Sequence, residues 1–231
     1  MSFTKRIAAG VVAASSLFLL VGTPGAQAGN LDLAETFESH VVGTDWADGS
    51  NHGRWRSRFD GYGEIDVQRA GSKVLSLKPK ASTSAGETHA ALVTTRKTFS
   101  NLSLTARAKT VKQLRTNNPN PWESAWVLWN YTDNTHFYYL ALKPNGWELG
   151  KADPAYPGAQ RFLATGSNMK FPVGKWADVE ITQVGRTMTV SANGQVLTTF
   201  TDNERPYTAG NVGLYNEDAK TYFDNVRVVG L

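Results

Sequence analysis

Two glutamates in the middle of the chain, Glu123 and Glu148, could do acid–base chemistry. Alternation along β-strands would place both carboxylates on one face of a sheet. Two carboxyl groups in one groove can divide the acid and base roles if burial raises the pKa of one and leaves the other ionised. We therefore interpret Glu123 and Glu148 as candidate catalytic residues. The alternative is that both are solvated carboxylates without a chemical role.

The residues around this pair suit a sugar ligand. Aromatic rings offer flat apolar surfaces to the C–H faces of sugar rings, and charged side chains can hydrogen-bond hydroxyl or carboxylate groups. In the alternative interpretation the aromatic side chains fill the core, since β-sandwiches are rich in Trp and Tyr. The predicted sugar-binding residues are Arg107, Trp129, Tyr131, His136, Tyr139 and Lys143.

The assignment of faces depends on strand parity. We take four leucines as core residues between the sheets, and we expect Trp126, Tyr138 and Trp147 to lean inward with them. A register error of one residue would move every side chain of a strand to the opposite face. The four leucines are Leu128, Leu140, Leu142 and Leu149.

The elements that must position these residues are antiparallel strands. From Trp176 to Val228 the chain alternates apolar and polar residues in successive segments, and Asn193-Gly194 is a strong hairpin signal between two of them. Similar segments separated by Gly, Pro, Asn and Asp run back to Glu64, and helical patterning is almost absent. The sequence predicts an all-β fold, a two-sheet antiparallel sandwich, with Ile181, Val190 and Val226 also in its core.

The first residues have the pattern of a secretory signal peptide. Lys5 and Arg6 precede an apolar run, and Ala26-Gln-Ala28 is a small-x-small cleavage site. We expect a signal peptide over residues 1–28, a single domain over 29–231 and an extracellular, secreted protein. A retained anchor helix is the alternative.

Composition narrows the functional classes further. The chain has no Cys, which excludes disulfides, zinc–thiolate sites and Cys nucleophiles, and which in a secreted protein is typical of bacteria. The formal net charge is +4, and no cluster of Lys and Arg residues is dense enough to bind nucleic acid. We expect a monomer without a nucleic-acid or membrane partner and without an organic cofactor. The Arg54-Trp-Arg-Ser-Arg58 segment either lines a groove rim or protects an edge strand.

Several phrases resemble the concanavalin A-like (laminin-G-like) superfamily, nearest its family-16-like 3-keto-disaccharide hydrolase type of domain. They include Gly146-Trp-Glu-Leu-Gly-Lys151, Gly210-x-x-Gly-Leu-Tyr215 and Phe223-Asp-Asn-Val226. The resemblance implies a jelly-roll fold and carbohydrate as ligand. It also implies a structural calcium ion near the chain ends, where Glu38 and Asp224 occupy the matching positions; alternatively, Asp224 caps a turn or pairs with Arg227.

One segment departs from the superfamily's catalytic signature. Glu64-Ile-Asp66-Val-Gln68 is close to the Glu-x-Asp-x-Glu motif of family 16 glycoside hydrolases. Gln68 replaces the final glutamate and cannot donate and recover a proton, and the segment comes too early in the chain. We interpret it as an ordinary strand.

Three functions remain open. A glycoside hydrolase acting on a poly- or oligosaccharide is favoured by the aromatic face with its carboxylates. A polysaccharide lyase would use Arg107, Lys143, Tyr139 and His136 to neutralise a uronate and remove a proton. A non-catalytic sugar-binding protein would use the same face without turnover.

Overall fold

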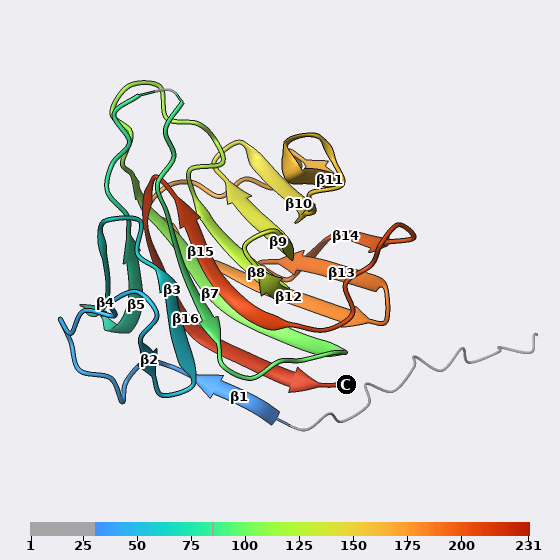
Figure 1. The fold of residues 1–231 in the computed structure, drawn as a ribbon, viewed down its shortest axis with the longest axis horizontal. Helices are drawn as coiled ribbons and strands as arrows, with labels where there is room; N and C mark the ends of the chain where they lie inside the picture. The colour runs from blue at the N-terminus through green and yellow to red at the C-terminus, as the bar shows by residue number, and fades with distance from the viewer. Residues whose placement is uncertain (1–30, 85) are drawn as a thin grey trace, which may run out of the picture.

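The computed structural model describes residues 31–84 and 86–231, so the predicted signal peptide lies outside the described residues. These residues form two antiparallel sheets that pack face to face, each of eight strands within the described part of the chain (Figure 1). The predicted two-sheet sandwich is confirmed. Helical structure in the described residues is limited to one short 3-10 turn, η1 (Pro157–Ala159). No described helix is long and apolar enough to cross a membrane.

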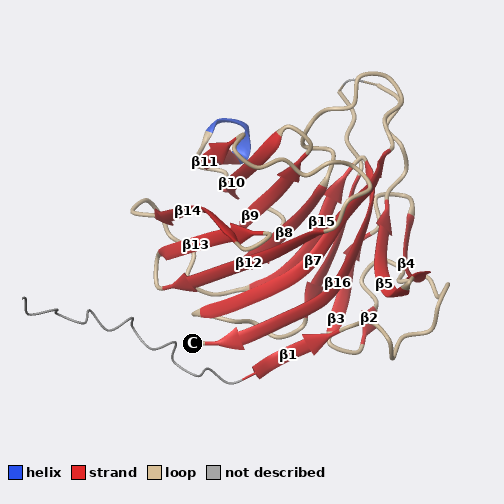
Figure 2. Cartoon of the chain, turned by 180° about the vertical axis from the view of Figure 1, so that it is seen from behind, coloured by secondary structure: helices blue, strands red, loops and turns tan. Residues whose placement is uncertain are grey.

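Sheet A holds the first and last described strands side by side, as Figure 2 shows from behind. Its strand β1 pairs with β16, and β16 lies between β7 and β5. In spatial order the strands of sheet A are β14 (Gln195–Thr201), β13 (Thr187–Ala192), β12 (Ala177–Val184), β7 (Leu102–Gln113), β16 (Ala219–Gly230), β5 (Ser72–Lys78) and β4 (Glu64–Ala70). Strand β1 (Leu31–Glu35) is outside this order and pairs only with β16.

Sheet B is built around the middle of the chain. The part of the chain that carries most of the predicted site residues supplies three adjacent strands, β8, β9 and β10. Strand β9 lies between the other two and pairs with both. Its strands in spatial order are β11 (Gln160–Gly166), β10 (Gly146–Ala152), β9 (His136–Lys143), β8 (Ala125–Asp133), β15 (Asn211–Glu217), β6 (Ala90–Thr95), β3 (Trp55–Phe59) and β2 (Asn51–His52).

The core between the sheets comes from alternating inward-facing residues. Six predicted core residues are at most 2% exposed in this cluster: Leu140, Leu142, Leu149, Ile181, Val190 and Val226. Tyr138 and Trp147 lie inward with them, as predicted. The predicted hairpin joins β13 to β14. Asn193 and Gly194 have φ angles of 49° and 77°, as a tight turn with left-handed backbone requires.

One end of the sandwich carries two loops that contact one another. Figure 1 shows residues 81–84 and 86–89 of one loop and residues 114–122 of another rising together above the strands. Arg115 joins them, because its Nη1 donates to the carbonyl oxygen of Ser84 and its Nη2 to that of Glu87 at 2.8 Å. This end of the sandwich borders the region in which the carboxylates of sheet B lie.

Candidate functional site

The outer face of sheet B, which is turned away from sheet A, carries a row of aromatic rings. The Trp126 ring on β8 stacks on Tyr139 of β9, with ring centroids 4.6 Å apart. On its other side Trp126 meets Tyr215 of β15 at 5.3 Å, edge to face. Its Nε1 donates to the carbonyl oxygen of Trp122, a residue that is itself 44% exposed. The row therefore contacts the backbone of Trp122, whose side chain is partly exposed.

A second aromatic group continues this face. Tyr131 lies beside Phe137, with centroids 6.0 Å apart, and the Arg58 guanidinium lies 5.2 Å above the Tyr131 ring. Tyr131 reaches this face because the strand has a bulge at Asn130, whose φ of 50° interrupts the alternation. Of the two roles considered for the Arg54 to Arg58 segment, the position of Arg58 favours the rim of the aromatic face.

Glu148 of β10 lies beside this row. The hydroxyl of Tyr139 donates to Glu148 Oε1 at 2.9 Å, and Lys143 Nζ lies 2.8 Å from Oε2. Gln160 in turn donates to the Tyr139 hydroxyl, and Gly150 leaves room for the Tyr139 ring, which a Cβ at that position would contact. Glu148, Tyr139 and Lys143 are thus brought together as predicted.

Glu217 at the end of β15 is a carboxylate that the sequence analysis missed. The Tyr215 hydroxyl donates to its Oε1 at 2.7 Å. Burial raises its pKa above the usual value for glutamate, and the nearby negative charges of Asp218, Glu123 and Glu148 raise it further. A raised pKa keeps the proton on Glu217 to a higher pH, which suits a general acid.

Glu123 lies just before β8, beneath the same region. Arg115 Nε donates to Glu123 Oε1 at 2.7 Å, and Asn120 donates to the same oxygen at 2.9 Å. Its Oε2 is buried without a hydrogen-bond partner, and the residue is 1% exposed. Arg115 also holds Asp218 at 3.0 Å. The contacts of Glu123 suit a charge that positions its neighbours better than a group that touches substrate.

The prediction that Trp129 lies on the outer face is wrong. Trp129 is fully buried between the sheets, and its Nε1 donates to Gln183 of sheet A at 2.6 Å. Trp126 and Leu128 were expected to face inward and lie instead in the outer cluster. The assignment for this part of β8 was shifted by one residue.

Two further predicted binding residues lie elsewhere. Arg107 belongs to β7 of sheet A, where its Nε is 3.2 Å from Asp178. His136 begins β9 but contacts Asp133 at 3.0 Å and the Tyr207 ring at 5.8 Å, away from the aromatic row. Of the six predicted binding residues, Tyr131, Tyr139 and Lys143 therefore lie on the outer face of sheet B. Glu148 of the predicted catalytic pair lies beside them, with Glu123 at the margin.

The residues predicted to bind calcium have other contacts. Glu38 Oε1 accepts a hydrogen bond from the backbone of Lys73, and Lys73 Nζ donates to the carbonyl oxygens of Glu38 and His40 at 2.7 and 2.8 Å. Asp224 accepts hydrogen bonds from Ser72 and from the backbone of Asn225. Within residues 31–84 and 86–231 no group of three or more His, Asp or Glu side chains is placed to hold a metal ion. These contacts fit an ammonium better than calcium, and a calcium ion here stays a prediction.

Thermal unfolding separates the two possibilities. We expect calcium and chelator to give the same melting temperature, because the Lys73 ammonium already occupies the carbonyl oxygens. Lys73→Met should cost about 1–3 kcal/mol through lost charged hydrogen bonds. The matched change Lys78→Met on the same strand, which loses only a half-exposed ion pair to Glu64 at 3.6 Å, should cost less than about 1 kcal/mol. A melting temperature that chelator lowers, and Asp224→Ala lowers equally, would restore the calcium prediction.

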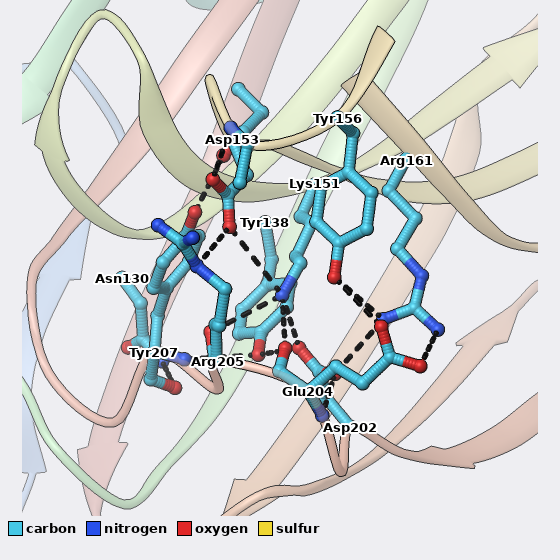
Figure 3. Close-up of polar contacts among 12 residues, drawn as sticks. Asn130, Tyr138, Lys151, Asp153, Tyr156, Arg161, Asp202, Glu204, Arg205 and Tyr207 are labelled. Carbon is cyan, nitrogen blue, oxygen red and sulfur yellow. Dashed lines mark hydrogen bonds and ion pairs between the residues drawn. The ribbon is translucent and has the colours of Figure 1, made fainter. Parts of the chain in front are cut away.

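A separate polar cluster is buried where β9 and β10 meet the connection from β14 to β15 (Figure 3). Lys151 is fully buried, and its Nζ lies 2.9 Å from Asp202 Oδ2 and 3.9 Å from Asp153 Oδ2. Tyr138 donates to Asp202 at 2.7 Å, and Arg205 Nε lies 3.2 Å from Asp153. Since Lys151 also contacts the backbone carbonyls of residues 204 and 205, the cluster holds this connection against sheet B.

The comparisons with known proteins agree with the fold. The model of the 3-keto-alpha-glucoside-1,2-lyase-like domain family matches residues 43–229. A search of curated proteins finds no match. The match over most of the chain confirms the resemblance to the concanavalin-like superfamily that the sequence motifs indicated.

Three solved structures illustrate the similarity. The carbohydrate-binding module CBM66 from Bacillus subtilis has a TM-score of 0.55 and 14% identity, over 78% of this chain and 98% of that one. A Bacillus subtilis protein of unknown function with a galectin-like fold has a TM-score of 0.57 and 12% identity, over 88% and 97%. SCLam, a non-specific endo-beta-1,3(4)-glucanase from family GH16, has a TM-score of 0.54 and 13% identity, over 88% and 91%. Identities this low show the fold alone.

Proposed function

Since the chain belongs to the family of 3-keto-alpha-glucoside-1,2-lyase-like domains, we propose that it cleaves a glycosidic bond in a saccharide bound on the outer face of sheet B. One observation carries this proposal: two carboxyl groups with opposite environments flank one aromatic row. Glu148 accepts hydrogen bonds from Tyr139 and Lys143, whereas burial and neighbouring carboxylates raise the pKa of Glu217. Groups whose surroundings differ in this way can act as base and acid.

In this proposal Glu217 donates a proton to the leaving glycosidic oxygen. Glu148 acts as base, and Tyr139 and Lys143 fix the direction in which its oxygens point. Sugar rings pack on the accessible aromatic side chains, which include Trp122 and Phe162, and the buried rings beneath keep the face rigid. Hydrolysis, in which Glu148 activates water, is the reaction favoured by the sequence analysis.

The family match favours a second reaction, elimination. A 3-keto group acidifies the hydrogen on C2 of the sugar. Glu148 would remove that proton, the electron pair of the C–H bond would form a C1–C2 double bond, and the C1–O bond would break with its electrons on the leaving oxygen. Glu217 would protonate that oxygen. The same two residues therefore serve both reactions, and the products distinguish them.

Incubation with a panel of neutral, uronic and 3-keto glycans, read by mass spectrometry and calorimetry, tests this function. Hydrolysis adds one water across the cleaved bond, whereas elimination leaves one fragment unsaturated and adds none. We expect Trp122→Ala and Phe162→Ala to weaken binding about tenfold each, since aromatic contacts contribute about 1 kcal/mol or more. Tyr62→Ala removes a ring that is 83% exposed outside this face, and should leave binding unchanged. Binding without any product would assign a lectin role instead.

We also propose that the domain is exported and acts as a monomer. The support is the candidate signal peptide over residues 1–28 and the size of the single core. Amino-terminal sequencing of the exported protein should begin at Gly29. Retention of residues 1–28 would favour the membrane-anchor alternative.

A further inference from the structure

The outer face of sheet A, opposite the proposed catalytic face, carries a ladder of alternating cations and aromatic rings. Arg107 lies 4.9 Å above the Trp176 ring, and Lys109 Nζ lies 4.9 Å from the same ring. Lys109 Nζ is also 5.3 Å from the Tyr222 ring, and Lys220 Nζ, on the same strand as Tyr222, lies 5.2 Å from that ring. We call these five residues the cationic ladder.

The ladder follows from sheet register. Arg107 and Lys109 stand two residues apart on β7, which places their side chains on one face about 7 Å from each other. Tyr222 of β16 is the direct partner of Lys109, and Trp176 immediately precedes β12, whose Asp178 is the partner of Arg107. The positive groups therefore lie on two neighbouring strands, β7 and β16, and the Trp176 ring adjoins them from the start of β12.

Two of the three positive charges lack a carboxylate partner. Within residues 31–84 and 86–231, ion pairs of 4.0 Å or less join Arg107 to Asp178 but join no carboxylate to Lys109 or Lys220. Lys220 Nζ instead contacts the side-chain oxygen of Gln68 at 2.9 Å. The Asp66 charge also acts on Lys220, but no ion pair of 4.0 Å or less joins them in the described residues. Lys109 and Lys220 thus offer a ligand two positive charges that no described carboxylate pairs with directly.

We propose that the cationic ladder binds an anionic polysaccharide, a chain of sugars carrying carboxylate or sulfate groups at regular intervals. Charge complementarity to Arg107, Lys109 and Lys220 carries this choice. Beside Arg107 lies a shallow depression of about 310 Å³, whose lining includes the carboxylates of Asp178 and Glu180 together with Ser191 and Asn225, and these groups can accept hydrogen bonds from sugar hydroxyls or donate to them. Repeating charges along the polymer would meet Arg107, Lys109 and Lys220 in turn, and sugar hydroxyls would meet Asp178, Ser191 and Asn225.

A nucleic acid fits this face less well. Single-strand binding depends on bases stacking on free aromatic faces. Here the protein's own cations already lie over both rings, so the ladder offers charge rather than stacking surface. This surface would hold the domain on an acidic polymer while the opposite face remains free to act on a saccharide.

Affinity measurements with defined polymers test the proposal. The full chain is titrated with polygalacturonate as the carboxylate polymer, dextran sulfate as the sulfate polymer, uncharged dextran and single-stranded oligo-dT. We expect binding to one or both polyanions, weakening as salt rises, and none to dextran. A higher affinity for polygalacturonate than for dextran sulfate would identify carboxylate as the preferred anionic group, and the reverse would identify sulfate.

Variants locate the site. Lys109→Gln combined with Lys220→Gln should lower affinity at least tenfold. Lys80→Gln combined with Lys170→Gln removes the same charge from exposed loop residues and should change it less than twofold. Circular dichroism and the activity of the opposite face should be unchanged in both, so failure here is distinct from failure of the proposed function. Equal effects of the two double variants, tighter binding to oligo-dT, or no binding to either polyanion would overturn the proposal.

Discussion

Lys151→Met should lower the free energy of unfolding by about 3–5 kcal/mol, because removing one partner of a buried ion pair leaves the others uncompensated. In wild type, the Lys151 ammonium lies between Asp202 at 2.9 Å and Asp153 at 3.9 Å, and all three side chains are fully buried. Met has a similar length, so packing is retained while the charge is lost. Denaturant titration followed by tryptophan fluorescence measures the change.

A double-mutant cycle separates charge from packing. Asp202→Asn alone should also be strongly destabilising, and combining it with Lys151→Met should cost less than the sum of the two single changes. Lys78→Met is the control, since its ion pair to Glu64 at 3.6 Å is half-exposed, lies outside this cluster and should contribute less than about 1 kcal/mol. A loss below that control for Lys151→Met would show that water or a shifted Arg205 compensates the buried acids.

The same cluster predicts a dependence on pH. Burial opposes ionisation of Asp202, but hydrogen bonds from Lys151 and Tyr138 outweigh it, and the pKa of Asp202 is lowered. A carboxyl with a lowered folded-state pKa contributes stability above its unfolded pKa of about 4, and that contribution is lost as pH falls through the lower folded value. Wild type should therefore lose stability below about pH 4 more steeply than Asp202→Asn does.

The strands and hairpin were predictable because alternation is a local property of the sequence. The faces of β8 were not, because residues 125–131 are all buried and their polar residue, Asn130, bonds to Gln183 on the inner side and does not mark the outer one. Trp126 and Trp129 exchanged places for that reason. Tyr131 was placed on the correct face only because the bulge at Asn130 reverses the alternation and so cancels the one-residue error of the prediction.

Alternation predicts which residues of a strand share a face, but it does not indicate to which of the two sheets the strand belongs. Arg107 does point outward, as predicted, but β7 pairs with β12 and β16 in sheet A. That assignment depends on pairing between strands far apart in sequence. Lys151 and Asp202 are likewise 51 residues apart, so no local pattern could indicate a buried lysine there.

Glu217 could have been found from the sequence. It follows Tyr215 by two residues, so alternation puts both on one face of the strand. The Gly210 to Tyr215 motif that the sequence analysis recognised stops two residues short, whereas β15 continues to Glu217 before the turn at Asp218. Extending the strand by two residues would have supplied the second carboxyl group, in place of Glu123.

Glu148→Gln should reduce turnover on a cleaved glycan by about 10²–10⁴-fold with little change in stability, because positioned acid–base groups contribute on that scale. Glutamine keeps the shape but cannot accept the proton. Glu217→Gln should cause a similar loss and should also remove the limb of the pH profile in which activity falls as pH rises, since a general acid is lost when it ionises. The raised pKa of Glu217 places that limb above the usual range for glutamate.

Controls identify what each loss means. Glu64→Gln changes an exposed carboxylate on sheet A and should leave turnover unchanged. Tyr139→Phe removes the hydroxyl that donates to Glu148 Oε1 at 2.9 Å. This change should lower kcat more than it alters KM, because the hydroxyl orients the base and does not itself bind the substrate. If both Glu148→Gln and Glu217→Gln keep full turnover with unaltered pH profiles, acid–base catalysis does not occur on this face. If Glu123→Gln alone abolishes turnover in a protein of normal stability, the Arg115-bound glutamate is the catalytic group instead.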